Sequence, residues 1–143
     1  MLIARVLGEK GQAVFTLTAE ATLEAACRAL HERKVGALVV LDAEGSVFGV
    51  LSERDLVREV ARAGAAGLSQ QVGVVMSRNV ITAEPHETID ECLGRMTDRR
   101  VRHLPVVDQG RLVGIVSIGD LVKHRIASAE AEAAAMQAYI SAN

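Results

Sequence analysis

Two short segments of the chain combine a glycine, a hydroxyl and a carboxylate at one spacing. They read Gly49-Val50-Leu51-Ser52-Glu53-Arg54-Asp55 and Gly114-Ile115-Val116-Ser117-Ile118-Gly119-Asp120. Each places its serine where an apolar run meets a helical pattern, and its aspartate three residues later. The backbone amides at a helix N-terminus attract a phosphate, and an ionised carboxylate accepts hydrogen bonds from a ribose diol. The segments therefore predict a nucleotide site.

The same segments also have a purely structural interpretation. Ser-x-x-Asp is close to a capping box, in which the serine caps the helix and the acidic side chain stabilises the first turn. Duplication would copy such caps together with everything else. The alternatives differ in outcome: replacing a ligand-binding Asp120 weakens binding, whereas replacing a cap lowers stability and leaves affinity intact.

A second candidate is the basic segment 99–103, Arg-Arg-Val-Arg-His. Its first two arginines fit a solvated helix C-terminus, where the helix dipole favours cations. Arg102 and His103 lead into a buried strand, where the corresponding earlier residues are Gly36 and Ala37. They either remain solvated or contact a phosphate, and in the second case the site is asymmetric.

These segments belong to a tandem repeat that fills most of the chain. The offset is 66 positions as far as Asp42 and Asp108, and 65 positions afterwards, so the second copy has lost one residue from a turn. Thr22 and Thr88 are good N-caps for a helix that opens each copy. An extended piece precedes each helix, at 13–17 and 79–83, and the apolar runs 37–41, 47–51, 104–107 and 112–116 predict strands, followed by helices at 53–63 and 118–127.

The expected fold class is α+β, with two β-α-β-β-α repeats packed through a pseudo-twofold axis. We expect the first repeat and its N-terminal lead-in at 1–66, the second repeat at 67–127 and a C-terminal helix at 128–143. The Ala/Gly-rich segment 62–71 is the best candidate for a linker. Met136 and Ile140 give the last helix a thin apolar stripe, which predicts that it needs a partner surface.

Composition limits the possible functions. The formal net charge of −2 and a pI near 6.1 argue against nucleic-acid binding. Cys27 and Cys92 lack metal-ligand spacing and are interpreted as core residues, and the remaining histidines as surface, so no metal site is expected. The apolar start of the chain is too short for an export signal or a membrane span, which predicts a cytoplasmic protein.

Motifs of several common enzymes are missing from the sequence. There is no Gly-x-Gly-x-x-Gly after a strand, no Walker A sequence, no His-Glu-x-x-His and no nucleophile elbow. The chain also has no room for the roughly 250 residues of a catalytic barrel. These absences predict a protein that is not an enzyme.

The paired motifs and the string Arg102-His103-Leu104-Pro105-Val106-Val107-Asp108 resemble the CBS domain pair, or Bateman module. The resemblance runs from about Val6 to Val122 and is of the stand-alone tandem type. It implies clefts between the repeats that bind AMP, ADP, ATP, NAD or S-adenosylmethionine, with the motif aspartate on the ribose. It also implies a homodimer.

Carried onto this chain, the resemblance implies two ligand-binding sets. One cleft would use Asp120 and Ser117 with Thr16, Thr18, Val35, Gly36 and Ala37. The other would use Asp55, Arg54 and Ser52 with Thr82, Val101, Arg102 and His103. The expected function is a non-catalytic sensor of energy or redox state whose ligand is an adenine nucleotide. The alternative is a ligand-free interaction module that docks a partner protein.

Overall fold

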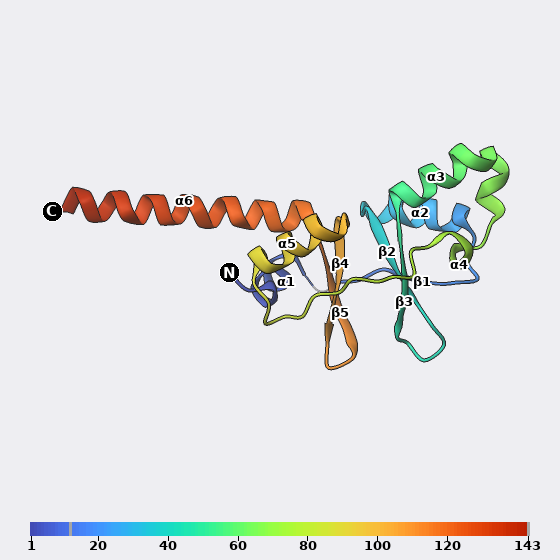
Figure 1. Ribbon diagram of the computed structural model, residues 1–143, viewed down its shortest axis with the longest axis horizontal. Coiled ribbons are helices and arrows are strands. Elements are labelled where there is room, and N and C mark those ends of the chain that lie inside the picture. The colour runs from blue at the N-terminus through green and yellow to red at the C-terminus, as the bar shows by residue number, and fades with distance from the viewer. Residues whose placement is uncertain (12, 143) are drawn as a thin grey trace. The chain divides into compact units, whose positions relative to one another are not determined.

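The computed structural model describes residues 1–11 and 13–142 (Figure 1). They form two compact units. The first-copy unit contains residues 13–81 and 109–113, and the second-copy unit contains residues 1–11, 82–108 and 114–142. The elements, in chain order, are α1 (Ile3–Lys10), β1 (Thr16–Thr18), α2 (Leu23–Arg33), β2 (Ala37–Leu41), β3 (Val47–Ser52), α3 (Glu53–Ala63), the 3₁₀-helix η1 (Gly64–Ser69), α4 (Val72–Val75), α5 (Ile89–Arg99), β4 (His103–Asp108), β5 (Arg111–Ser117) and α6 (Ile118–Ala142).

The first-copy unit is a three-stranded sheet covered by helices. β1 pairs in parallel with β2, and β2 pairs antiparallel with β3, so that Ala37 lies opposite Ser52. The β2–β3 ladder shifts register between Val40 and Leu41. Aliphatic residues from α2, β2, β3, α3 and α4 form the core, which contains Leu23, Leu30, Leu38, Val40, Leu51, Leu56 and Val72. The chain has only three aromatic residues, and none of them is among the buried members of this core.

The second-copy unit repeats this plan with a two-stranded sheet, β4–β5. The extended piece before α5 contributes only a single parallel bridge, between Ala83 and Val106. Thr88 caps α5 by accepting the N–H of Glu91 at 3.1 Å, as its spacing predicts. The α+β class and the two β-α-β-β-α repeats are confirmed, although the second copy reduces its first strand to one bridge.

Helix α1 is an element that the sequence analysis did not predict. Ile3 and Val6 are fully buried, and the N–H groups of Ile3 and Ala4 donate to the carbonyls of Glu87 and Pro85, both at 2.9 Å. The lead-in that we assigned to the first repeat thus packs on the second-copy unit. Eight residues are too few for periodicity to reveal a helix that gains its stability from tertiary contacts.

Two further segments differ from expectation. The predicted linker at 62–71 contains the end of α3 and η1, where Gly67 is buried against Glu59 because it has no Cβ. The helices expected at 118–127 and 128–143 are one continuous helix, α6, as far as Ala142, and residue 143 lies outside the described residues. No helix-breaking residue separates the two parts, and the alanines that follow favour continuation.

Candidate functional site at the two strand-to-helix corners

The corner of the first copy is a closed capping box. The Asp55 carboxylate atom Oδ2 accepts the Ser52 N–H at 2.9 Å and the Ser52 hydroxyl at 3.1 Å, while Ser52 Oγ accepts the Asp55 N–H at 3.4 Å. The other carboxylate oxygen, Oδ1, lies 3.3 Å from the guanidinium of Arg58. Only 4% of the Asp55 side chain is exposed. The capping interpretation therefore describes Asp55 in this structure.

The corner of the second copy has the same box but a different partner. Asp120 Oδ2 accepts the Ser117 N–H at 2.9 Å, and Ser117 Oγ accepts the Asp120 N–H at 3.1 Å. Lys10, at the end of α1, donates to Asp120 Oδ2 at 2.5 Å and to the Ile115 carbonyl at 2.8 Å. The Asp120 side chain is 26% exposed. The hydrogen bonds from Lys10 and from the Ser117 N–H both go to the same oxygen, Oδ2.

The ionisation of Asp120 follows from these contacts. Partial burial acts to raise the pKa of this carboxyl group, but the hydrogen bonds from Lys10 and Ser117 outweigh burial and hold the pKa below its ordinary value. Asp120 is therefore a carboxylate at neutral pH. A carboxylate accepts the hydrogen bonds that a diol donates, which is the chemistry predicted for this position.

Each corner lies beside the strand lead-in of its own copy. The Glu53 N–H donates to the Gly36 carbonyl at 3.0 Å, and the Ile118 N–H donates to the Arg102 carbonyl at 2.8 Å. Val35, Gly36 and Ala37 are thus next to Ser52, and Val101, Arg102 and His103 are next to Ser117. The contacts within each unit thus join a corner to the lead-in that the prediction assigned to the other cleft.

The predicted threonines lie on the extended segments. Thr16 and Thr18 are exposed on β1, and Thr16 is in register with Val39 of β2. Thr82 is half-buried at the corresponding place in the second copy. Arg54 is exposed on the first turn of α3.

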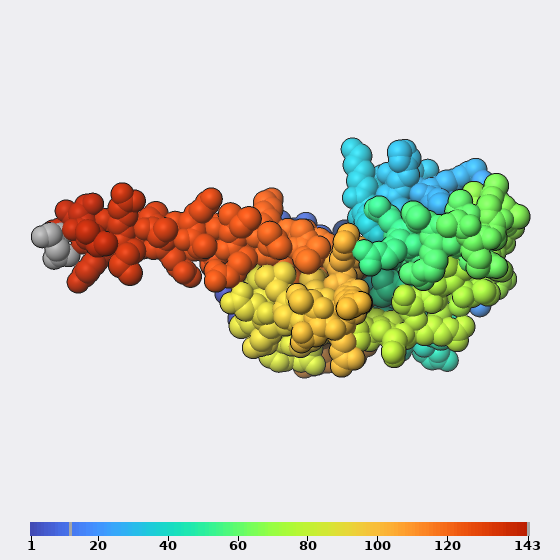
Figure 2. Space-filling view, turned by 45° about the horizontal axis from the view of Figure 1, so that its top comes forward, coloured from blue at the N-terminus to red at the C-terminus, as the bar shows by residue number. Residues whose placement is uncertain are grey.

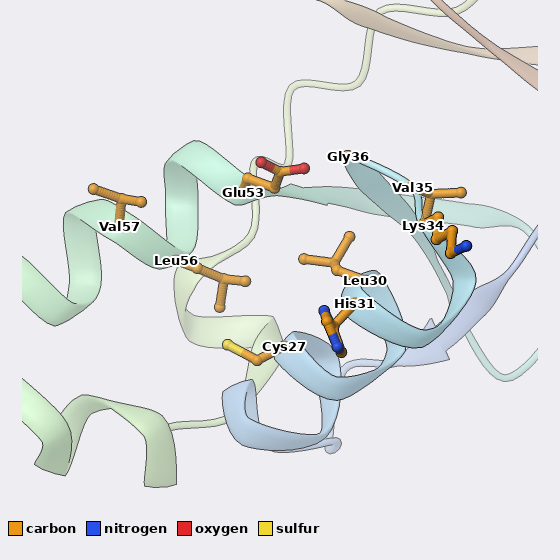
Figure 3. A pocket seen from close by; sticks show the side chains of 9 residues that line it. All are labelled: Cys27, Leu30, His31, Lys34, Val35, Gly36, Glu53, Leu56 and Val57. Atoms are coloured by element: carbon orange, nitrogen blue, oxygen red, sulfur yellow. The ribbon is translucent and has the colours of Figure 1, made fainter.

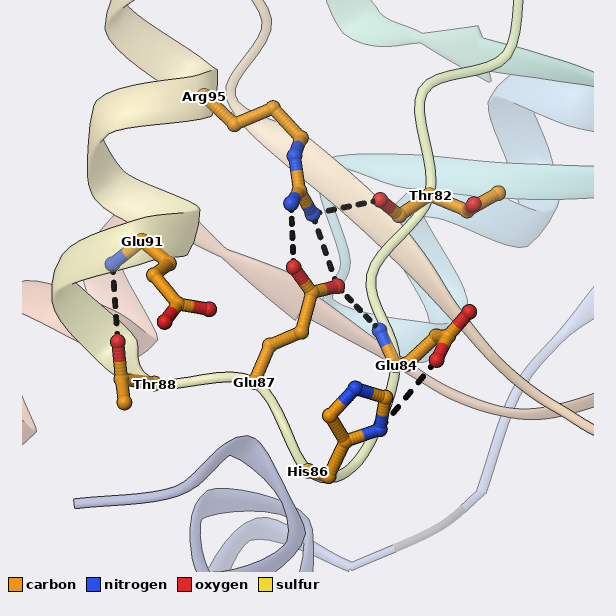
Figure 4. A network of polar contacts seen from close by, with 7 residues as sticks. All are labelled: Thr82, Glu84, His86, Glu87, Thr88, Glu91 and Arg95. Carbon is orange, nitrogen blue, oxygen red and sulfur yellow. Dashed lines mark hydrogen bonds and ion pairs between the residues drawn. The ribbon is translucent and has the colours of Figure 1, made fainter.

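An arginine that the sequence analysis missed holds the Thr82 segment (Figure 4). Arg95, on α5, donates from Nη1 to the Thr82 carbonyl at 2.9 Å and to Glu87 Oε1 at 3.0 Å, and its Nη2 bonds Glu87 Oε2. The Glu84 N–H donates to Glu87 Oε1 at 2.8 Å. We call Arg95, Glu87, Glu84 and Thr82 the Arg95 network.

Charge stabilises the Arg95 network. The hydrogen bond from Arg95 lowers the pKa of Glu87 below its ordinary value, although burial acts in the opposite direction, and the same bond raises the pKa of Arg95. The first copy has Ala21 and Ala29 at the positions of Glu87 and Arg95. That mismatch between the copies is the sequence signal that could have revealed the network.

A pocket of about 580 Å³ lies between α2 and α3 in the first-copy unit (Figure 3). It is lined by Cys27, Leu30, His31, Lys34, Val35, Gly36, Glu53, Leu56 and Val57. Several of its lining side chains are apolar, and burial raises the pKa of the Cys27 thiol, which disfavours the nucleophilic thiolate. Of the predicted site residues, only Val35 and Gly36 line this pocket.

Two other kinds of site are absent from the described residues. No group of three or more His, Cys, Asp or Glu side chains there could hold a metal ion. Likewise, residues 1–11 and 13–142 contain no helix long and apolar enough to cross a membrane.

Two copies of a β-α-β-β-α unit, each with a Ser-x-x-Asp corner between its last strand and last helix, define a tandem-repeat α+β protein. The profile of the CBS domain matches residues 12–62 and 72–127. The chain belongs to the CBS domain family and carries a tandem pair, as the resemblance predicted.

Known relatives include stand-alone CBS-domain proteins. The CBS domain-containing protein YhcV of Bacillus subtilis is 31% identical, and the match covers 85% of each chain. The crystal structure of ATU1752 from Agrobacterium tumefaciens superposes with a TM-score of 0.85 at 45% identity, covering 87% of this chain and 99% of that one. The CBS domain pair of MJ0100, crystallised with 5-methylthioadenosine and S-adenosylmethionine, has a TM-score of 0.77 at 25% identity, covering 86% and 98%.

Proposed function

We propose that this chain is a non-catalytic regulatory module that binds adenosine-containing nucleotides, namely AMP, ADP, ATP or NAD, in clefts between its repeats. The observation that carries the proposal is the Asp120 carboxylate. It is ionised and partly exposed, and it lies at the N-terminus of α6. A diol and a phosphate are the two groups that such a corner recognises.

The relatives support adenosine as the common part of the ligand. MJ0100 was crystallised with 5-methylthioadenosine and S-adenosylmethionine, which share an adenosine group. If the aspartate binds the ribose and the adjacent cleft binds the adenine, the site can accept adenosine compounds that carry different groups on the 5′ carbon. The regulated quantity is then an energy or redox state, depending on whether the ligand is an adenylate or NAD.

The two clefts should differ in how readily they bind a nucleotide. The Asp120 cleft would also use Ser117, Thr16, Thr18 and residues 35–37. In the second cleft, Asp55 must first exchange its bonds to Ser52 and Arg58, because both of its oxygens are engaged. Arg54, Thr82, Val101, Arg102 and His103 would complete that cleft. We therefore expect the Asp120 cleft to fill first.

Regulation requires the nucleotide to bind two conformations of the protein unequally. Closure of the clefts supplies such a difference, and we propose that it acts in a homodimer in the cytoplasm. The output is passed to a partner protein by the change in conformation. No chemical step by this chain is needed.

Isothermal titration calorimetry with AMP, ADP, ATP and NAD tests the proposal. A hydrogen bond to a charged group contributes about 1.5–3 kcal/mol, so Asp120→Asn should weaken binding of the preferred nucleotide at least about tenfold. Thr88→Ala is the matched control, because it removes a helix cap outside the corner. It should lower stability by about 0.5–2 kcal/mol and leave affinity unchanged.

Two results would overturn the nucleotide site. One is full affinity in Asp120→Asn. The other is the absence of heat for every adenosine compound at millimolar concentration, which favours the alternative of a ligand-free interaction module. Asp55→Asn, measured in parallel, compares the two clefts. We expect this variant to lose less affinity than Asp120→Asn.

A further inference from the structure

The second half of α6 carries large apolar side chains on its surface. Residues 129–142 are all exposed, and they include Met136 and Ile140, which are 60% and 66% exposed. The helix is continuous with its first turns, which pack on the rest of the second-copy unit and bury Leu121 (Figures 1 and 2). Apolar side chains of this size in water favour association.

The apolar residues of α6 follow the spacing of a coiled coil. The positions Val122, Ile126, Ala129, Ala133, Met136 and Ile140 are separated by four, three, four, three and four residues. This alternation is the a/d repeat of a two-stranded coiled coil, with Ile126, Ala133 and Ile140 at a and the other three at d. We call these six residues the α6 seam. All six are exposed.

We propose that the α6 seam pairs with the α6 seam of a second copy of this chain in a parallel, in-register coiled coil. The two central alanines let the helices approach closely, and the larger residues lie at both ends. We choose a second copy of the chain as the partner of the α6 seam, because a helix with a strict heptad repeat packs on another helix with the same repeat.

The charges beside the seam set the direction of pairing. Arg125 occupies a g position and Glu130 the e position five residues later, which meet across a parallel dimer. Both side chains are exposed, and Arg125 already contacts Asp90 of its own chain at 3.2 Å. If the two seams paired in antiparallel directions, the twofold axis of the dimer would pass at Ala131. Glu130 of one chain would then face Glu130 of the other, and Glu132 would face Glu132. Repulsion therefore disfavours the antiparallel dimer.

Oxidative crosslinking of the full chain tests the pairing. In the parallel dimer each a position faces its own copy, so Ala133→Cys should give a disulfide-linked dimer under mild oxidation. Ala131→Cys is the matched control, because it lies on the opposite face of the same turn and its sulfur points away. A disulfide needs the two Cα atoms within about 7 Å, which excludes Ala131→Cys.

The native cysteines, Cys27 and Cys92, should not form crosslinks in this assay. Burial raises the pKa of Cys27 and brings that of Cys92 to about 11, so neither is a thiolate at neutral pH. The parent chain serves as the blank. Circular dichroism of each variant confirms an unchanged helix content, as exposed alanines should permit.

Three outcomes would overturn the proposal. The first is equal crosslinking at positions 131 and 133. The second is no crosslink at 133 while sedimentation shows a dimer, because the tails are then unpaired. The third is a crosslink that forms only in a mixture of Ala129→Cys and Ala133→Cys chains, which identifies the antiparallel dimer. A disulfide-linked dimer formed by Ala133→Cys chains, and not by Ala131→Cys chains, supports the proposal.

Discussion

The two copies have the same Ser-x-x-Asp corner but different surroundings. In the first copy Arg58, one turn along α3, covers Asp55, and 4% of that side chain is exposed. In the second copy Lys10 reaches Asp120 from α1, outside the repeat, and 26% of the side chain is exposed. The comparison shows that the same capping box leaves its carboxylate buried in one copy and partly exposed in the other, depending on the residues around it.

The segments that enter the two copies differ in the same way. In the first copy, β1 forms a ladder of three residues with β2. In the second copy, Ala83 alone bridges β4, and the Arg95 network holds the neighbouring Thr82 carbonyl. Backbone pairing in one copy is thus replaced by a charged side chain in the other. The second copy should therefore depend on single side chains more than the first.

The largest expected effect on stability comes from removing the Arg95 side chain. Arg95→Ala leaves the half-buried Glu87 carboxylate without its cation and the Thr82 carbonyl without its donor, so we expect a loss of about 2–3 kcal/mol in the free energy of unfolding. Arg28→Ala is the control on α2, because Arg28 pairs with Glu24 at an exposed i,i+4 position. Its loss should stay below about 0.5 kcal/mol.

Urea unfolding followed by circular dichroism measures both variants. Similar losses for the two would mean that the Arg95 network is no stronger than a surface ion pair. The comparison of the entry segments would then be wrong.

A smaller effect should distinguish the first glycine of each motif. A Cβ on Gly49 would lie 2.5 Å from the Met76 sulfur and 3.0 Å from the Ser77 carbonyl, which cannot retreat because it accepts the Val50 N–H. Overpacking of this kind costs about 1–3 kcal/mol, and we expect about 2 kcal/mol for Gly49→Ala.

The second glycine has a softer neighbour. A Cβ on Gly114 would meet only the end of the Leu7 side chain, at 2.6 Å, and a flexible side chain can move. We expect about 1 kcal/mol for Gly114→Ala. Thermal unfolding of both variants checks the order, and a larger loss at Gly114 would contradict it.

The sequence predicted the elements that carry periodic patterns. Thr22, Thr88 and the apolar runs identify the helices and strands of both copies, because each pattern lies within one element. Lys10 and Arg95 were missed for a common reason. Each acts on a partner that no local period connects to it: Asp120 lies 110 positions away, and Glu87 precedes the helix that holds Arg95.

The position of the predicted aspartates on helix corners was likewise readable, but their exposure was not. Arg58 contacts Asp55 from one turn along the same helix, whereas Lys10 reaches Asp120 from α1, 110 positions away in the sequence. The place of each aspartate in the fold can thus be read from the motif, whereas the exposure of its carboxylate could not be.

The smallest expected effect tests the Lys10 contact by its pH dependence. The pKa of Asp120 is lowered in the folded protein, so the contact stabilises the fold fully above the ordinary aspartate value of about 3.9 and loses that effect as the pH falls through the lower folded value. Lys10→Gln should therefore be less stable than the parent by up to about 1 kcal/mol at pH 7, and the gap should narrow as the pH falls below the ordinary aspartate pKa. Lys123→Gln makes the same change of charge at an exposed position of α6 and should show no such gap. Urea unfolding at four or five pH values measures the difference. A gap that persists unchanged at low pH would show that Lys10 acts through its packing rather than through the ionised Asp120.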